Sequence, residues 1–156
     1  MTENRTLIAY TTKSGAAEKT AKKIAEVLKA KYGLQADLVN LAKQSAPILE
    51  PYRNVIVGTG VRGGKIYEET IAFLNKDFGD RQLAYYTCSG FIYPKTYDET
   101  VTWYITNVLA NYQNFKPIAA EAFGGYLKII GISVSRKMDM DKVEAWAVEL
   151  GKKFSG

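Results

Sequence analysis

Short apolar segments alternate with longer amphipathic segments along the whole chain. The apolar segments have the length and composition of β-strands, and Asn54–Gly58 is apolar enough to be buried on both faces of a sheet. The predicted strands are Thr6–Thr11, Gln35–Asn40, Asn54–Gly58, Gln82–Cys88 and Ile118–Phe123.

Helical periodicity fills most of the intervals between these strands. In the first interval, apolar residues recur at i, i+3, i+4 and i+7 from Ala21 to Leu28. The segment Gly124–Met138 has no clear period and is predicted to be irregular. The predicted helices are Ala16–Lys31, Tyr67–Phe78, a third that begins after the capping box Thr96-x-x-Glu99, and a fourth that begins near Asp139 or Asp141.

Strict alternation of strand and helix predicts a single α/β domain over residues 1–156. The expected architecture is a three-layer α/β/α sandwich around a five-stranded parallel sheet. We expect the strands, numbered along the chain, in the order 2-1-3-4-5, so that the first, third and fourth strands are adjacent. A ligand of such a sheet binds at the carboxyl ends of the strands, beside the point where the strand order reverses.

Polar loops rich in small residues follow those three adjacent strands: Thr11–Ala17, Gly58–Gly64 and Thr87–Phe91. In the first, a strand turns directly into a helix, which aims unpaired N–H groups at one spot and favours a phosphate there. Hydroxyls of Thr11, Thr12 and Ser14 add donors, and the small residues Gly15, Ala16 and Ala17 let an anion approach the main chain. The convergence of three such loops predicts a phosphate-bearing ligand with a flat ring.

The alternative for the first loop is an ordinary helix start capped by Ser or Thr. Its Lys13 is out of frame for G-x-x-x-x-G-K-[ST], and the loop does not match G-x-G-x-x-G either. A mononucleotide phosphate is therefore favoured over ATP or NAD.

The composition removes several kinds of chemistry. The chain has no His and one Cys, which excludes a Ser-His-Asp triad, an internal disulfide and a Cys-cluster metal site. Chemistry must then come from carboxylates, Lys, Tyr, Cys88 or a bound cofactor.

The net charge is +5, but Lys and Arg are spread along the chain, and the densest set has the spacing of a solvated helix face. No nucleic-acid partner is therefore predicted. No apolar run approaches the ~20 residues that a membrane span needs, and the N-terminus has no signal-peptide core. We expect no transmembrane segment and a cytoplasmic location.

The segment Thr12-Lys13-Ser14-Gly15-Ala16-Ala17-Glu18 follows the pattern [ST]-x-[ST]-G-[NS]-[TA]-E, with Ala16 in place of the usual Asn. With the other two loops, it resembles the flavodoxin-like FMN-binding family over nearly the whole chain. Two further segments, Gly58-Thr-Gly-Val-Arg-Gly-Gly-Lys and Ala122-Phe-Gly-Gly-Tyr126, are similar to the branch that includes menaquinone-dependent protoporphyrinogen oxidase.

The resemblance implies FMN as cofactor and assigns its contacts by loop. The phosphate contacts would be Thr11, Thr12, Lys13, Ser14, Gly15, Ala16 and Ala17; the contacts on the inner ring face Thr59, Gly60, Val61, Arg62 and Gly63; and those at the pyrimidine edge Thr87, Cys88, Ser89, Gly90 and Phe91. One of Phe91, Tyr93 and Tyr97 would cover the outer ring face.

Individual residues in this set have more than one interpretation. Arg62 matches the position where the family often stacks an aromatic on the ring. Gly63 is either a peptide that turns toward the reduced ring or a simple turn glycine. Cys88 is expected to be a small buried thiol, and Tyr85 and Tyr86 to point to opposite faces of their strand.

The favoured function is electron transfer between partner proteins, since Gly124–Met138 is shorter than the matching region of the oxidases. The enzyme alternative is a quinone-linked flavin oxidoreductase of the protoporphyrinogen oxidase type. A non-redox alternative is a basic adaptor without flavin, which would stay colourless when FMN is added.

Overall fold

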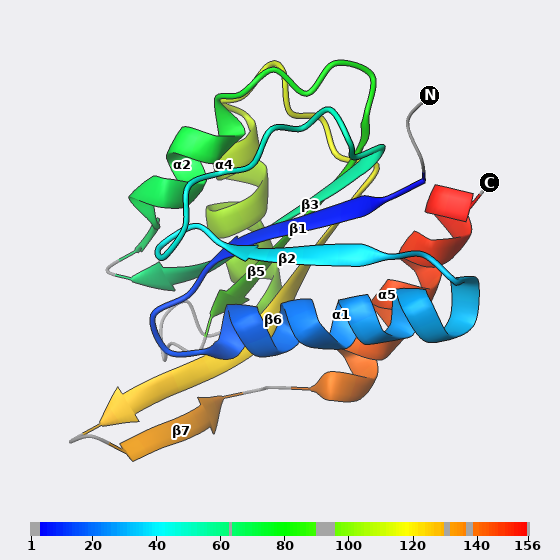
Figure 1. Cartoon of the computed structure of the whole chain (residues 1–156). Helices are drawn as coiled ribbons and strands as arrows, with labels where there is room; N and C mark the ends of the chain where they lie inside the picture. Colours follow the sequence, from blue (N-terminus) through cyan, green and yellow to red (C-terminus); the bar gives the residue numbers. More distant parts are fainter. Residues whose placement is uncertain (1–3, 63, 90–95, 130–131, 137–138, 156) are drawn as a thin grey trace.

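A parallel sheet of five strands carries the fold (Figure 1). The computed structural model describes residues 4–62, 64–89, 96–129, 132–136 and 139–155, with only the main chain described over 125–129 and 132–136. The strands are β1 (Thr6–Thr11), β2 (Ala36–Asn40), β3 (Asn54–Arg62), β5 (Gln82–Ser89) and β6 (Ala119–Ile129). They lie in the order β2-β1-β3-β5-β6 with every neighbouring pair parallel. The predicted fold class and strand order are confirmed.

Two short antiparallel strands extend this sheet. β4 (Lys65–Ile66) folds back on the end of β3, and β7 (Ile132–Arg136) folds back on the end of β6. The prediction that Gly124–Met138 is irregular was therefore wrong: β6 continues to Ile129 and forms a hairpin with β7. Figure 1 shows this hairpin projecting beyond the other strands.

The third predicted strand was also too short, because it was ended at Gly58. β3 runs on to Arg62, and Val61 is buried opposite Ile66 of β4. Alternation of Thr59 and Val61 with small residues keeps the segment extended, and burial of the β-branched side chains outweighs the turn tendency of the glycines.

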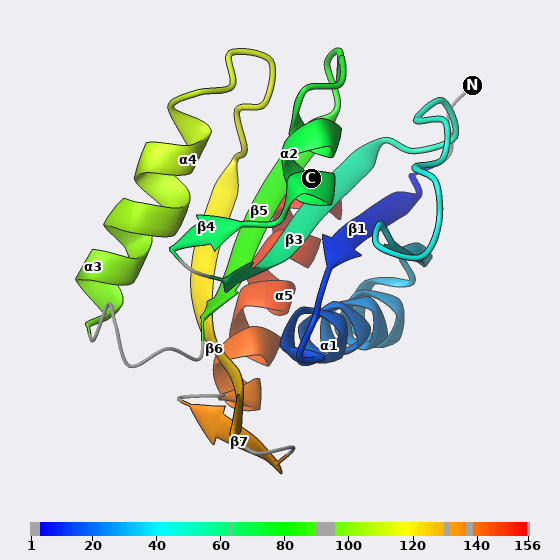
Figure 2. The same cartoon turned by 90° about the vertical axis from the view of Figure 1, so that its left-hand side faces the viewer.

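Helices cover both faces of the sheet (Figures 1 and 2). On one face lie α1 (Ala16–Tyr32) and α5 (Met140–Ser155). On the other lie α2 (Glu68–Leu74) and a composite helix made of α3 (Tyr97–Val101), a π-helical turn η1 (Thr102–Thr106) and α4 (Asn107–Leu109). Among the helices described, none is long and apolar enough to cross a membrane.

The predicted starts of the helices agree with the structure better than the predicted ends do. Thr96 caps the composite helix as predicted, with its Oγ1 accepting a hydrogen bond from the Glu99 N–H at 3.1 Å. The second helix was predicted to reach Phe78, but α2 ends at Leu74. Within this helix, Ile71 is 37% exposed, whereas Phe73 is buried.

Two apolar cores, one on each face of the sheet, hold the layers together. Tyr85 and Tyr86 are fully buried neighbours on β5 that point to opposite cores, as predicted. The Tyr85 hydroxyl donates to the main-chain oxygen of Tyr104 at 3.0 Å, and the Tyr86 hydroxyl donates to that of Ala17 at 2.8 Å. Tyr86 thus connects the central strand to the first turn of α1.

Candidate functional site: the carboxyl edge of the sheet

The three predicted loops lie at the same edge of the sheet. Thr11 of β1 pairs in register with Thr59 of β3, which pairs with Thr87 of β5. These parts of the three predicted loops therefore lie side by side at the carboxyl edge of the sheet, on the left of Figure 1, although β3 continues to Arg62 and β5 to Ser89 beyond this level. This is the juxtaposition that the ligand hypothesis requires.

The first loop enters α1 without a side-chain cap. Its N-cap residue is Gly15, in the left-handed region at φ 98°, and among the described residues no side chain caps the N–H groups of the first helical turn. Thr12 Oγ1 instead accepts from the Gly15 N–H at 2.9 Å, and the Ser14 hydroxyl has no partner among the described residues. The alternative of a plain Ser or Thr cap is therefore wrong. The N–H groups of the first helical turn stay open to an anion.

A row of buried threonines lies just beneath the edge. The Thr70 hydroxyl of α2 lies 3.1 Å from the hydroxyls of both Thr11 and Thr59, and Thr59 donates to the main-chain oxygen of Gly60 at 2.7 Å. The side chains of Thr11 and Thr59 are thus used inside the protein, which leaves their main chain for a ligand. Thr87 Oγ1 is buried without a hydrogen-bond partner among the described residues.

Tyr67, which follows the β3–β4 pair, connects the second loop with the first loop. A Cβ on Gly60 would lie 3.0 Å from Cε2 of the Tyr67 ring, and the Lys13 ammonium lies 5.4 Å from the centre of that ring. Burial raises the pKa of Tyr67, while the nearby charge of Arg62 opposes that rise. From the sequence, Tyr67 was predicted only as the first residue of a helix. Its position directly after the glycine-rich turn could have marked it as a site residue.

The remaining predicted residues of the second loop differ in exposure. The Val61 side chain is buried in the core on the α2 face, so only its main chain is free for a ligand. Arg62 is exposed and lies opposite Lys65 in the β3–β4 register. Gly63 is outside the described residues. The contacts of this loop with a ring stay predictions.

The third loop is described only at its start. Cys88 is buried, with its Sγ 3.4 Å from Thr20 Oγ1, and burial raises the pKa of the thiol to about 12. It is therefore a neutral thiol at physiological pH, as expected of a packed core residue. Ser89 ends β5 and is half-buried. The predicted contacts Gly90 and Phe91, and the candidate Tyr93, lie outside the described residues.

Tyr97, a further aromatic candidate, stands at the start of α3 and is 49% exposed. Its hydroxyl donates to the Glu121 carboxylate, and this bond is the main cause that raises the pKa of Tyr97 to about 12. The Lys142 ammonium lies 4.2 Å from the Tyr97 ring centre and 3.6 Å from Glu121. Tyr97 is thus held beside β6 by Glu121 of β6 and Lys142 of α5.

The arrangement fits a flavin mononucleotide better than a metal. In the described part of the chain, no three Cys or acidic side chains are placed to hold a metal ion. The open first turn of α1 and the free Ser14 hydroxyl suit a phosphate, and the orphaned Thr87 hydroxyl offers a polar contact beside the neighbouring loops.

Comparison with known proteins agrees with this geometry. Residues 7–149 match the model of the family described as the flavodoxin domain. No curated protein sequence matches the chain.

Among solved structures, flavodoxin 2 from Bacillus cereus in its oxidised state is similar, with a TM-score of 0.70 and 21% identity over 96% of this chain and 99% of that one. Oxidised flavodoxin 1 from the same organism has a TM-score of 0.67 and 16% identity over 97% of both chains. Rubredoxin:oxygen oxidoreductase from Desulfovibrio gigas has a TM-score of 0.68 and 13% identity over 99% of this chain and 37% of that one.

The specific resemblance to the protoporphyrinogen oxidase branch is not supported by these comparisons. The match over 7–149 covers most of the 156 residues, and the fold is that of the flavodoxins over nearly their full length. The protein therefore belongs to the flavodoxin domain family, and its cofactor is FMN.

Proposed function

We propose that the protein carries electrons between partner proteins through FMN bound at the carboxyl edge of its sheet. The observation that carries this proposal is the uncapped start of α1 at the carboxyl edge of the sheet, where Thr11 of β1, Thr59 of β3 and Thr87 of β5 lie in register. Bound FMN accepts and donates one or two electrons, which no side chain of this chain does at ordinary potentials.

The chain's own contribution is to bind and orient the flavin. The phosphate would be held by the first-turn N–H groups of α1 and by the hydroxyls of Thr12 and Ser14. The ring would lie between the second and third loops, where Gly60 leaves room and Tyr67 offers an aromatic face. Flavin held in this way at a surface edge is accessible to a partner protein.

Three exposed cations surround this edge: Lys13, Arg62 and Lys65. Arg62 and Lys65 are direct cross-strand neighbours, an arrangement in which like charges repel. The ion pairs of the described residues include none of the three, although Glu68 and Glu69 follow in the first turn of α2. Such an edge favours an acidic protein partner.

Stopped-flow measurement of electron transfer from the reduced protein to an acidic redox protein tests the proposal. We expect a rate that falls as salt is added, because exposed charges are screened beyond about 8–10 Å. Arg62→Glu should slow the transfer by about two- to fivefold at low salt, the effect of one exposed ion pair. Lys76→Glu makes the same change in net charge on an exposed residue after α2 and should have a smaller effect.

The alternative function is a quinone-linked flavin oxidoreductase. The sequence argument against this alternative was that Gly124–Met138 is a short irregular segment. The β6–β7 hairpin weakens that argument, because much of the segment forms two paired strands. Rapid, salt-insensitive reduction of a water-soluble quinone, together with slow transfer to every protein acceptor, would favour this alternative and reject the carrier proposal.

A further inference from the structure

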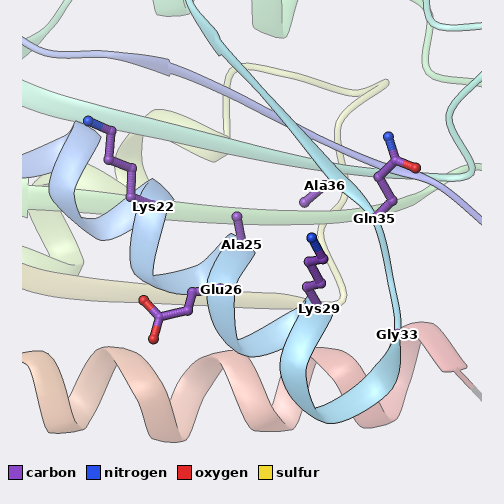
Figure 3. A pocket seen from close by; sticks show the side chains of 7 residues that line it. All are labelled: Lys22, Ala25, Glu26, Lys29, Gly33, Gln35 and Ala36. Carbon is purple, nitrogen blue, oxygen red and sulfur yellow. The ribbon is translucent and has the colours of Figure 1, made fainter.

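A groove runs between α1 and the edge strand β2, on a part of the molecule that the flavin site does not use. Its volume is about 780 Å³, and it is lined by Lys22, Ala25, Glu26, Lys29, Gly33, Gln35 and Ala36 (Figure 3). Gln35 and Ala36 lie at the start of β2, whereas the proposed FMN site is at the carboxyl ends of the strands. A molecule in the groove would leave the flavin edge free.

One wall of the groove is an open sheet edge. Among the described strands β2 pairs only with β1, and Figure 1 shows it as the front edge of the sheet beside α1. The ladder to β1 includes the bonds from Thr6 N to Gln35 O at 3.0 Å and from Leu41 N to Tyr10 O at 2.7 Å. Bonding residues alternate along a parallel ladder, so the main-chain groups of Ala36 and Leu38 point outward. An extended chain could pair with them.

The other wall is positively charged. Lys22 and Lys29 are exposed, and neither forms an ion pair with a described residue. In Figure 3 the Lys29 ammonium points toward β2, whereas the Glu26 carboxylate points away from the strand. Glu26 instead lies 3.8 Å from Lys23. The floor between the walls is formed by the small side chains of Ala25 and Ala36.

The spacing of the two lysines fits an extended acidic chain. They are seven positions apart on the helix, a rise of about 10.5 Å. An extended chain covers that length in about three residues, so carboxylates two or four positions apart on one face would reach both lysines. A second copy of this protein is a poor occupant, since it would bring another pair of lysines against the first.

We propose that this groove binds an extended, acidic segment of a partner protein, which adds as a strand to the open edge of β2. Main-chain pairing with Ala36 and Leu38 supplies the register, and Lys22 and Lys29 select for carboxylates. The proposal does not depend on the flavin, so it can fail while the proposed function stands, and the reverse also holds.

The test is an NMR titration of the full-length protein with three peptides. The first is an alternating Glu-Val octapeptide, the second replaces each Glu by Gln, and the third alternates Glu with Pro, which has no N–H to donate to a ladder. We expect only the Glu-Val peptide to bind at low salt, with slower hydrogen exchange at the Ala36 and Leu38 amides.

Charge reversal separates the groove from general attraction to a basic protein. The double variant Lys22→Glu/Lys29→Glu should weaken binding of the Glu-Val peptide by at least about tenfold. Lys76→Glu/Lys116→Glu changes the net charge equally at exposed residues outside the groove and should change the affinity by less than about twofold.

Three outcomes would overturn the proposal. Equal binding of the Glu-Pro peptide would show that charge alone acts, without strand pairing. Unchanged exchange at Ala36 and Leu38 in the saturated complex would place the peptide elsewhere. A single-stranded oligonucleotide that binds the groove as tightly as the Glu-Val peptide would assign it to phosphate chains instead.

Discussion

Ser14→Asp should abolish FMN binding while it leaves the fold intact. Ser14 lies in the first loop with a hydroxyl that no described residue bonds, beside the uncapped start of α1. A carboxylate there repels the phosphate and occupies the open N–H groups. Losing one hydrogen bond to a charged group costs about 1.5–3 kcal/mol, and repulsion adds to that, so we expect FMN to bind at least about 100-fold more weakly.

Two controls make this measurement specific. Ser14→Asn has nearly the same size and shape as Ser14→Asp but no charge, and should keep most of the affinity. Riboflavin has no phosphate, so its affinity should be the same for wild type and Ser14→Asp. A Ser14→Asp protein that binds FMN as wild type does would place the phosphate elsewhere and refute the assignment of this loop.

Gly58→Ala should lower the stability more than most single methyl additions do. A Cβ at this position would lie 2.0 Å from Cζ and 2.3 Å from the hydroxyl oxygen of Tyr86. The Tyr86 ring is fully buried, packs edge-on against Trp146 and is held by its bond to the Ala17 carbonyl, so it has little room to move. Overpacking costs about 1–3 kcal/mol and occasionally more, and we expect the upper end of that range.

A double-mutant cycle with Tyr86→Leu tests the cause of that loss. If the clash is responsible, Gly58→Ala should cost at least about 1.5 kcal/mol less in the Tyr86→Leu background, measured by urea denaturation. Equal costs in both backgrounds would show that the glycine is required for another reason. The Tyr86 hydroxyl donates to the main-chain oxygen of Ala17, in the helical turn proposed to hold the phosphate. The single variant Gly58→Ala, with Tyr86 unchanged, should therefore also weaken FMN binding.

Much of the fold could be predicted because the sequence signals were local and consistent. Apolar runs marked the five parallel strands, and the capping pattern at Thr96 and Glu99 marked a helix start that the structure confirms. The three loops could be brought together because parallel strands end at one edge. The ladder from Thr11 through Thr59 to Thr87 shows that they do.

The missed features depend on pairing and contacts that the periodicity of the sequence does not indicate. β6 continues past Phe123 because its end pairs with β7, and β3 continues past Gly58 because Val61 is buried opposite Ile66 of β4. Lys13 and Tyr67 are in contact although they are 54 positions apart in the sequence, and no periodicity indicates such a contact. The threonine row has the same origin, since Thr70 reaches Thr11 and Thr59 only in the folded chain.

The most direct test of the account is to compare the affinities of FMN and riboflavin for the wild-type apoprotein by titration, following the quenching of flavin fluorescence. We expect FMN to bind one equivalent and to produce a yellow protein, with riboflavin at least about 100-fold weaker because it lacks the phosphate contacts of the first loop. Equal affinities for the two flavins, or a protein that stays colourless with excess FMN, would contradict the phosphate site at the start of α1.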